Sequence, residues 1–526
     1  MFKYILKEPG IKLIKASLVF ALLYCLLFNL AVFSYKFQYL SSNTYGAIIE
    51  FAKDFIYNII TLYIIFFGLT VYRSLFIIGS LFLFITGALT SYYLFFFSIS
   101  PTPALMPTIY GTNSTEMYEL ISVRIIIWIM FCVSICIYFI KYFNISTSRS
   151  FLTRILAAVC LLIAIGNIIA PKFNFLKSYF PIQYLHNSYM HFFEQSEKYD
   201  RLDISSKYSF IDSSEDDVIG VLVIGESARY GNFGLNGYER DTTPHLQKED
   251  IISYKARSCA STTYLSVPCM LSRFGEQDLA KVDTESSVLS ILTSLKFETM
   301  WFGTQSISKY YRSKPGGSFY DEVNFHMIPG GSAIMQPNSI DGKLLPYLAD
   351  NIKNNNKKFI VLHTTGSHWN YAARYPKEFA KFLPEISDSL KSDAASVGAN
   401  ERLNSYDNSI LYTDFILSRV IDILKHKKAF MIYVSDHGES LGEGGRLTHA
   451  ADEYFPEQRT VPFMIWFSDS YKLVHADKWD AAQIAKKDIS HDYIFHTILD
   501  CLNIESEAID PSLSLCRKDI SRKEMK

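Results

Sequence analysis

The chain has 526 residues, of which 49% are hydrophobic and 15% aromatic, and its 51 basic side chains nearly balance its 52 acidic ones. A chain of this length predicts several domains. The balanced charge argues against a nucleic-acid partner, because nucleic-acid binding relies on a strongly basic surface.

Long apolar runs fall before about residue 172. Several are long enough to cross a bilayer, which takes about 20 apolar residues, and they lie near 13–35, 55–72, 74–98, 120–140 and 152–170. Lys and Arg residues precede the first run and lie between the second and third and between the fourth and fifth, whereas the long connection after the third run has none. We therefore expect a multi-pass bundle of five spans over residues 1–172, with a cytoplasmic amino terminus and everything after the fifth span on the opposite side.

Residues 173–214 are rich in aromatic side chains but contain too many charges to span a membrane. We expect this segment to be an interfacial linker that rests on the membrane surface. A hydrophobic linker helix is the alternative.

Half of the cysteines lie in the predicted spans, where a free thiol behaves as a small hydrophobe: Cys25, Cys132, Cys136 and Cys160. The others form two local pairs, Cys259 with Cys269 and Cys501 with Cys516. Short spacings in an oxidising compartment predict disulfides.

The first pair encloses three consecutive alcohols, Ser261, Thr262 and Thr263. A disulfide between Cys259 and Cys269 would restrict where these hydroxyl groups can lie. It could equally be a simple staple of the loop.

From residue 215 to 526, short apolar runs alternate with stretches of helical periodicity. Runs of strand length lie at 218–227, 297–303, 357–368, 427–440 and 461–468. Nearly continuous apolar strands that alternate with helices predict an α/β domain with a central, mainly parallel sheet covered on both faces.

Polar residues follow several of these strands: Glu226, His363 with His368, and Asp436 with His437. Ligands bind beyond the carboxyl ends of strands in such sheets. Each residue has an ordinary alternative, since an acid after a strand often caps a helix and a lone histidine is often only a hydrogen-bonding group. Together, Glu226, Asp436 and His437 offer the three ligands of a catalytic zinc, whose open position a loop hydroxyl could fill as an activated nucleophile.

Four motifs carry a resemblance to a known family: "VLVIGESARYGNFGLNGYERDTTPHL", "SCASTTYLSVPCM", "LHTTGSHWNYAARYP" and "SDHGESLGEGGRLTHA". The chain resembles the bacterial phosphoethanolamine transferases, which include the mobile colistin resistance enzymes. The resemblance implies a multi-pass inner-membrane protein with five transmembrane helices and a periplasmic catalytic domain of the alkaline phosphatase/sulfatase superfamily. The extra cysteine pairs of the mobile resistance enzymes are missing here.

The resemblance also implies roles for individual residues. Zn²⁺ would be held by Glu226, Thr263, Asp436 and His437. Thr263 would be the nucleophile, and His368 and His449 would stabilise the phosphate or protonate a leaving oxygen. His363 is expected to be structural. In the loop "TNSTE", Thr112 and Glu116 would bind the ethanolamine head group, although an exposed loop with a capping box is an equal alternative.

The implied reaction takes phosphoethanolamine from phosphatidylethanolamine, through a covalent adduct on Thr263, to an acceptor on lipopolysaccharide. Residues 366–385, residues 404–422 and the late cysteine pair look closer to the branch that modifies the Kdo sugar than to the branch that modifies lipid A phosphates. The expected partners are these two lipids and the surrounding membrane lipids, and we expect a monomer.

Other functions share parts of this pattern. A lipoteichoic acid synthase or a sulfatase-type hydrolase has the same architecture, but the disulfide-held loop and "TNSTE" favour phosphoethanolamine transfer. A non-catalytic protein that binds lipopolysaccharide is the alternative from another class, and the complete set of candidate ligands argues against it.

Overall fold

The computed structural model describes residues 8–39, 44–103, 105–111, 121–144, 151–171, 174–193, 201–211, 217–305, 324–327, 340–354, 357–387, 394–450, 454–485 and 488–517. The chain forms two compact units. A helical unit comprises Met1–Met106 and Ile121–Ser196, and an α/β unit comprises Pro107–Leu120 and Glu197–Lys526.

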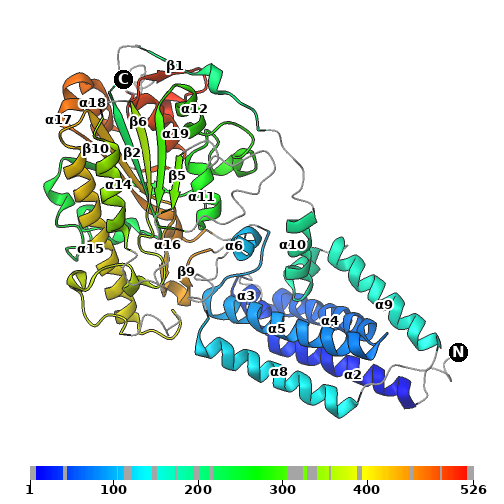
Figure 1. The fold of residues 1–526 in the computed structure, drawn as a ribbon. Coiled ribbons are helices and arrows are strands. Elements are labelled where there is room, and N and C mark those ends of the chain that lie inside the picture. The colour runs from blue at the N-terminus through cyan, green and yellow to red at the C-terminus, as the bar shows by residue number, and fades with distance from the viewer. Residues whose placement is uncertain are drawn as a thin grey trace. The chain divides into compact units, whose positions relative to one another are not determined.

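The helical unit consists of long apolar helices (Figure 1). They are α2 (Glu8–Tyr24), the π-helical turn η1 (Cys25–Asn29), α3 (Leu30–Tyr39), α4 (Thr44–Leu69), α5 (Arg73–Phe97), α8 (Val123–Phe143), α9 (Phe151–Ile169) and α10 (Ile182–Phe193). The short helix α6 (Met106–Gly111) follows α5 in the chain.

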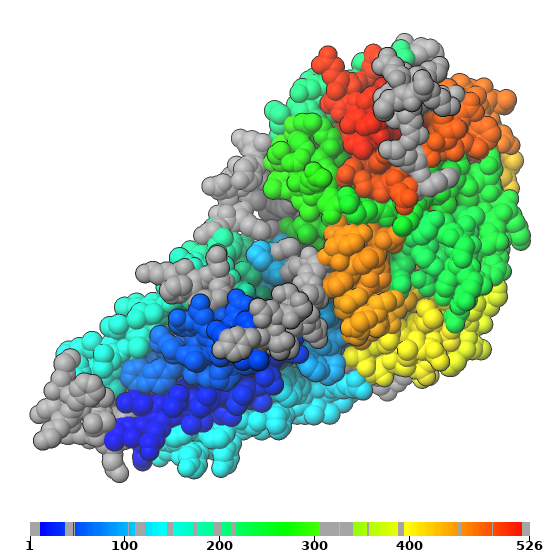
Figure 2. All heavy atoms as spheres, turned by 180° about the vertical axis from the view of Figure 1, so that it is seen from behind, coloured from blue at the N-terminus to red at the C-terminus, as the bar shows by residue number. Residues whose placement is uncertain are grey.

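Five stretches in the described part of this unit are long and apolar enough to cross a membrane: Ile11–Lys36, Ile48–Leu69, Arg73–Phe97, Val123–Phe143 and Phe151–Ile169. They confirm the five predicted spans. Many apolar side chains on these helices are exposed, for example Ile127 on α8 and Leu162 on α9. Helices α2 and α8 lie side by side on this apolar surface (Figure 2). Such a surface suits contact with lipid chains.

Residues 174–193, which the sequence placed in an interfacial linker over 173–214, pack within the helical unit. The side chain of Asn29 donates to the carbonyl oxygen of Phe180 at 2.8 Å and accepts from its N–H at 2.9 Å. Tyr184 on α10 bonds through its hydroxyl to that of Thr86 at 2.5 Å. These bonds make α10 part of the bundle, while its position at a membrane surface stays a prediction.

The α/β unit is built around an eight-stranded sheet in the order β11-β3-β10-β7-β2-β6-β4-β5. The strands are β2 (Ile219–Gly225), β3 (Ile251–Arg257), β4 (Glu298–Gly303), β5 (Asn324–Met327), β6 (Lys358–His363), β7 (Ala429–Ser435), β10 (Thr460–Phe467) and β11 (Asp488–Ser490). Only β10 runs antiparallel to its neighbours among these paired strands. The sheet is therefore mainly parallel, as predicted.

Two short sheets lie beside the main one. They pair β1 (Ser209–Phe210) with β12 (Ile504–Glu505), and β8 (Ser440–Leu441) with β9 (Leu447–Thr448). The helices of the unit are α11 (Thr263–Met270), α12 (Val288–Ser294), α14 (Leu344–Asn351), α15 (Ala399–Leu424), α16 (Pro456–Arg459), α17 (Asp469–Val474), α18 (Ala476–Ile484) and α19 (Tyr493–Cys501).

Both faces of the main sheet are covered (Figure 1). Every residue of β2 and of β7 is buried. Alternate side chains of β7, such as Phe430 and Ile432, share a hydrophobic core with α12 and α19. The intervening residues, such as Tyr433, lie on the opposite face, because successive side chains of a strand alternate. That second face is covered by α15 and α14.

Candidate active site

The predicted ligands come from two neighbouring parallel strands. In the register of β2 with β7, Gly225 is paired with Ser435. Glu226 and Asp436 therefore leave the sheet side by side at its carboxyl edge, with His437 next in the chain. All three side chains are completely buried. This is the position at which such sheets bind ligands.

Thr263 reaches the same edge from β3, which leads into the disulfide loop and then α11. Its hydroxyl oxygen donates to Glu226 Oε2 at 3.0 Å and lies 3.4 Å from His437 Nε2. His437 Nε2 is in turn 3.2 Å from Glu226 Oε1 and 3.5 Å from Asp436 Oδ2. The four residues thus form one tight cluster.

The three buried ionisable groups shift one another's protonation. Burial disfavours the charged form of Glu226, but the attraction of His437 outweighs it and holds the pKa of Glu226 well below its usual range. Burial, reinforced by the Glu226 charge, raises the pKa of Asp436 well above its usual value. Burial opposes protonation of His437, yet the charges of Asp436 and Glu226 raise its pKa to about 10. The cluster therefore favours a positive charge at its centre.

This cluster could hold a metal ion. Glu226, Asp436 and His437 each offer a ligand atom, and these atoms all lie within 4.8 Å of one another. Asp436 Oδ2 is buried and makes no hydrogen bond to the described residues. A buried carboxylate oxygen without a partner is costly, and a cation between these side chains would supply one. The residues present therefore fit a metal site of oxygen and nitrogen ligands.

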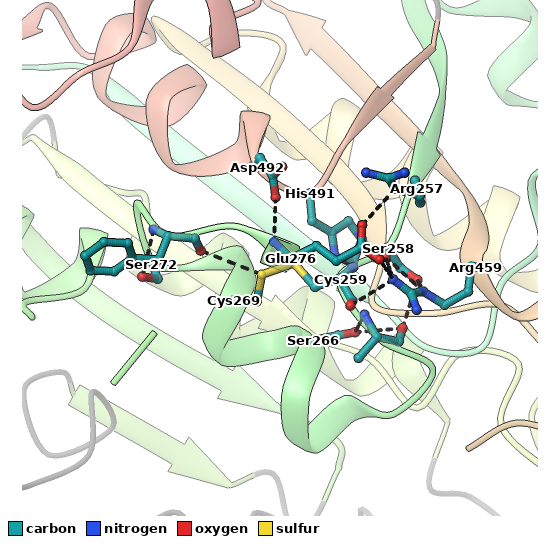
Figure 3. Close-up of a disulfide and its surroundings, with 12 residues drawn as sticks. Arg257, Ser258, Cys259, Ser266, Cys269, Ser272, Glu276, Arg459, His491 and Asp492 are labelled. Atoms are coloured by element: carbon teal, nitrogen blue, oxygen red, sulfur yellow. Dashed lines mark hydrogen bonds and ion pairs between the residues drawn. A yellow bond between two sulfur atoms is a disulfide. The ribbon is translucent and has the colours of Figure 1, made fainter. Parts of the chain in front are cut away.

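The disulfide loop is held in place from one side by a buried arginine (Figure 3). Cys259 and Cys269 form the predicted disulfide, as do Cys501 and Cys516. Arg459 donates to the carbonyl oxygens of Ser258 and Cys259, at 2.6 and 2.8 Å. The backbone that precedes the three alcohols is thus fixed by a charged donor.

The structure separates the three alcohols of the loop. Thr263 is the first residue of α11 and Thr262 is its N-cap, without a side-chain capping bond. The Thr262 hydroxyl oxygen is buried and makes no hydrogen bond to the described residues. The carbonyl oxygen of Ser261 accepts from the N–H of Ala450 at 2.9 Å. The Thr263 hydroxyl, in contrast, contacts both Glu226 and His437.

His368 and His449 lie beside the cluster, while their role at the phosphate stays a prediction. Their rings are 5.4 Å apart between centroids, and the His449 ring is 4.2 Å from that of His437. Glu226, His368 and His449 form a second group with ligand atoms within 4.8 Å. Burial, reinforced by the charge of His437, lowers the pKa of His449.

A fully buried carboxylate orients His449. Glu439 Oε2 lies 2.8 Å from His449 Nδ1, and Glu439 Oε1 accepts from the Tyr371 hydroxyl at 2.7 Å. A carboxylate partner places the imidazole proton on Nδ1 and leaves Nε2 available for chemistry. The sequence carried a signal for Glu439, since it stands two residues after His437 in "SDHGES".

Glycines permit two close approaches around the ligands. A Cβ atom at Gly438 would lie 2.2 Å from the carbonyl oxygen of Glu457, so the chain can pass there only without a side chain. Gly366 adopts a φ of +49°. A Cβ atom at this residue would lie within 2.9 Å of the backbone of Glu226, so a side chain does not fit there. The absence of a side chain at both positions thus lets the backbone pass close to the segments beside the ligands.

The remaining predicted residues lie apart from the cluster. His363 is buried edge-on against Trp301, with 5.6 Å between ring centroids, and belongs to none of the potential metal groups in the described residues. The structural role expected for His363 stays a prediction. Thr112 and Glu116 fall outside the described residues, so their role in head-group binding stays a prediction.

Sequence reasoning missed several polar residues that support the site. Gln305 donates to Glu226 Oε2 at 2.7 Å and to the carbonyl oxygen of Thr364 at 2.8 Å. Gln305 follows β4 by two residues, so its place at a strand end was the available signal. His491 hydrogen-bonds to the backbone of Cys259 and of Ser435, and it carried no such signal because it lies outside every predicted motif.

Comparison with known families agrees with this geometry. The profile of the family described as Sulfatase matches residues 219–504, which is more than half of the chain. A second profile, described as "Phosphoethanolamine transferase EptA/EptB", matches residues 59–190. These matches confirm the resemblance predicted from the motifs.

Two curated relatives are similar to the chain. "Kdo(2)-lipid A phosphoethanolamine 7''-transferase" of Escherichia coli (strain K12) is 33% identical over 326 residues, covering 60% of this chain and 56% of the relative. "Phosphatidylethanolamine transferase Mcr-1" of Escherichia coli is 33% identical over 315 residues, covering 56% of each. The chain thus spans about half the length of the curated relatives it matches.

Solved structures extend the similarity in fold. The integral membrane protein lipooligosaccharide phosphoethanolamine transferase A (EptA) from Neisseria meningitidis is 24% identical, with a TM-score of 0.77 over 96% of this chain and 99% of that one. The periplasmic domain of EcEptC from Escherichia coli, solved as a complex with zinc, is 23% identical, with a TM-score of 0.52 over 60% of this chain and 89% of that one. At these identities the likeness shows the fold alone.

Proposed function

Because the chain belongs to the sulfatase family, we propose that it transfers phosphoethanolamine from phosphatidylethanolamine to lipopolysaccharide. The observation that carries the proposal is the position of Thr263. Its hydroxyl group lies at the start of α11, 3.0 Å from Glu226 and 3.4 Å from His437, at the carboxyl edge of the sheet. The names of the two relatives supply the donor and the transferred group.

We assign the metal site to Zn²⁺, held by Glu226, Asp436 and His437 with Thr263 as the fourth ligand. Carboxylate and imidazole side chains are good zinc ligands, and three of them leave one position for a reacting oxygen. Bound zinc would lower the pKa of the Thr263 hydroxyl and neutralise charge that develops on the phosphoryl group.

In the first half of the reaction, Thr263 Oγ1 forms a bond to phosphorus while the bond from phosphorus to the diacylglycerol oxygen breaks. Thr263 loses a proton and the diacylglycerol oxygen gains one. His449, with Nδ1 held by Glu439, has Nε2 for this proton transfer. The N-terminus of α11 adds a favourable dipole for the phosphate.

In the second half, an acceptor oxygen of lipopolysaccharide attacks phosphorus and releases Thr263. His368 and His449 would take the acceptor's proton, return a proton to Thr263 Oγ1 as its bond to phosphorus breaks, and stabilise the charge on the phosphoryl oxygens. Thr112 and Glu116 are proposed to hold the ethanolamine head group, whose ammonium suits a carboxylate. Kdo is the proposed acceptor. This is supported by the relative "Kdo(2)-lipid A phosphoethanolamine 7''-transferase", whose name includes this sugar.

The proposed location follows from the substrates. Both are membrane lipids, so the five candidate spans would anchor the protein in the bacterial inner membrane, with the α/β unit in the periplasm. We propose separately that the protein is a monomer. An oxidising compartment also suits the two disulfides.

Mass spectrometry of lipopolysaccharide tests the proposal. Cells that express the protein should gain one phosphoethanolamine group on Kdo, and cells that express Thr263→Ala should not. A gain on the lipid A phosphates would correct the acceptor alone. No gain on either moiety, with the protein present in the membrane, would refute the transferase function and favour a hydrolase or a binding protein.

A further inference from the structure

A buried histidine outside the predicted motifs bridges two parts of the site. His491 lies between β11 and α19, and its side chain is almost completely buried. The N–H of Cys259 donates to its Nδ1 at 3.2 Å, and its Nε2 lies 2.9 Å from the carbonyl oxygen of Ser435. A carbonyl can only accept, so Nε2 carries the proton. Both ring nitrogens are therefore used, and the tautomer is fixed.

Both partners of His491 belong to segments that carry the reaction. Cys259 begins the disulfide loop that leads to Thr263. Ser435 is the last residue of β7, immediately before Asp436 and His437.

Ser435 links His491 to the segment that carries the remaining candidate ligand, Glu226. Its hydroxyl donates to the carbonyl oxygen of His437 at 2.9 Å. The same hydroxyl accepts from the N–H of Ala228 at 2.8 Å, two residues after Glu226. His491 and Ser435 thus join the three backbone segments on which all four candidate ligands stand.

The backbone of His491 and the side chain of Asp492 also bind the chain on either side of the disulfide loop, and Figure 3 shows the Asp492 contact with Glu276. The backbone N–H of His491 donates to the carbonyl oxygen of Arg257 at 3.0 Å. Asp492 Oδ1 accepts from the N–H of Glu276 at 3.2 Å, beyond the second cysteine of the disulfide. The junction of β11 with α19 therefore holds the loop before and after the disulfide.

We propose that His491 is a positioning residue that sets the distance between the Thr263 loop and the metal ligands. The inference rests on the proposed function, because it concerns the same nucleophile and the same zinc. Misplacement of a nucleophile by about 1 Å can lower the rate about 100-fold. Residues that orient metal ligands commonly change metal affinity or activity by about 10- to 100-fold when altered.

His491 acts as a neutral bridge rather than as a proton carrier. Burial lowers its pKa to about 3. Its two hydrogen bonds go to backbone groups, which neither take up nor release protons. Its contribution is thus the geometry that it imposes on Cys259 and Ser435.

The test compares variants of His491 with a matched control five residues further along the chain, using the full chain in detergent. His491→Leu removes both hydrogen bonds, and His491→Asn places an amide oxygen where Nδ1 accepts from Cys259. His496, on α19, provides the control because it is equally buried and its Nδ1 also accepts one backbone N–H, that of Asp510 at 3.0 Å. His496→Leu therefore removes a comparable ring without touching the site.

Two readouts are needed: kcat and KM with phosphatidylethanolamine in mixed micelles, and the dissociation constant for zinc alone, from competition with a chelator. We expect His491→Leu to lower kcat about 10- to 100-fold, to leave KM within about twofold, and to weaken zinc binding about 10-fold. His491→Asn should recover part of kcat, and His496→Leu should change neither kcat nor zinc affinity more than about twofold.

Equal effects of His491→Leu and His496→Leu on both readouts would overturn the proposal. If His491→Leu does not fold, the comparison of His491→Asn with His496→Leu decides in the same way. Absence of transfer by the unaltered chain would refute the proposed function alone, because the zinc measurement would still show whether His491 positions the ligands.

Discussion

One oxygen atom of the site, Asp436 Oδ2, indicates that the site is suited to a bound cation. It is buried, makes no hydrogen bond to the described residues, and has His437 Nε2 3.5 Å away. Burial and the Glu226 charge raise the pKa of Asp436, so its charged form requires a cation nearby as compensation. A bound metal ion is therefore expected to stabilise this unit as well as to serve the reaction.

We predict that His437→Ala releases the metal. The variant loses the one imidazole among the four proposed ligands, and the remaining ligands leave the coordination of zinc incomplete. Elemental analysis of the purified full chain should show about one zinc in the unaltered protein and almost none in the variant. Unchanged zinc in His437→Ala would remove this residue from the site.

Thr263→Ala should abolish transfer while fold and zinc content are largely kept, because the lost group is the attacking atom and only one of four ligands. Thr262→Ala is the matched control, since the Thr262 hydroxyl makes no hydrogen bond to the described residues, and we expect its rate to stay within about threefold. Incubation with phosphatidylethanolamine and no acceptor should give an adduct that peptide mass spectrometry maps to Thr263. Turnover by Thr263→Ala would contradict this role.

Residues of the site differ in how far the sequence could predict them. Glu226, Asp436 and His437 end apolar strands, and strand ends at one edge of a parallel sheet come together for reasons of topology alone. Thr263 could not be distinguished from its two neighbours by spacing, because only the start of α11 determines which hydroxyl reaches the ligands. His491 was missed because its function depends on the pairing of β11 with β3, which a short segment does not reveal.

At the scale of elements, the antiparallel direction of β10 is explained by the position of the segment that precedes it, which carries part of the site. The described residues 436–450, which carry Asp436, His437 and His449, follow β7 at the carboxyl edge of the sheet, and β10 begins at Thr460. The chain therefore re-enters the sheet from that edge, with Val434 paired to Phe463, and β10 runs antiparallel to β7. The apolar sequence of β10 predicted a strand but contained no information on its direction.

Removing each disulfide in turn should show that both contribute to stability but only the first contributes to catalysis. They close loops of similar length, with separations of 10 and 15 residues, so each should contribute about 2 to 3 kcal/mol to stability. Replacing Cys259 and Cys269 by serine should also lower kcat, to a value between those of Thr262→Ala and Thr263→Ala. Replacing Cys501 and Cys516 should lower the thermal midpoint alone. Equal kcat values in the two double variants would show that the first disulfide is only a staple.

At the scale of the whole molecule, the distribution of Lys and Arg predicts the topology. A reporter that is active only in the periplasm should work when fused after residue 215 and fail when fused near Arg149. Full-length fusion protein in the membrane, detected by immunoblotting, is the control for both. The reverse pattern would place the α/β unit in the cytoplasm and remove the basis for the disulfides.

Buried neutral histidines predict that acid destabilises the fold. Burial lowers the pKa of His363 and of His496 to about 4, below the value of about 6.5 in an unfolded chain. Between pH 6.5 and 4 the unfolded chain binds protons that the folded chain excludes, so each histidine lowers the free energy of unfolding by about 1.4 kcal/mol per pH unit. Above pH 6.5 both states are neutral and the effect vanishes.

The contribution of His496 can be isolated by substitution. Asp414, whose pKa burial raises to about 7, acts in the opposite direction, so the pH profile of the unaltered chain is a sum. The thermal midpoint of His496→Leu should fall less between pH 7.5 and 5.0 than that of the unaltered chain. Identical falls would mean that His496 is protonated in the folded state.

The hydrogen bonds of His491 to Cys259 and Ser435 affect how truncated copies of this gene should be interpreted. The ribosome makes all four candidate ligands before it reaches His491, so a frameshift just before Asp488 leaves every signature motif encoded. Such a gene would pass a search for Glu226, Thr263, Asp436 and His437, yet its product would lack the histidine that joins them. Truncated copies of this kind should be scored as inactive unless their last strand and helix are intact.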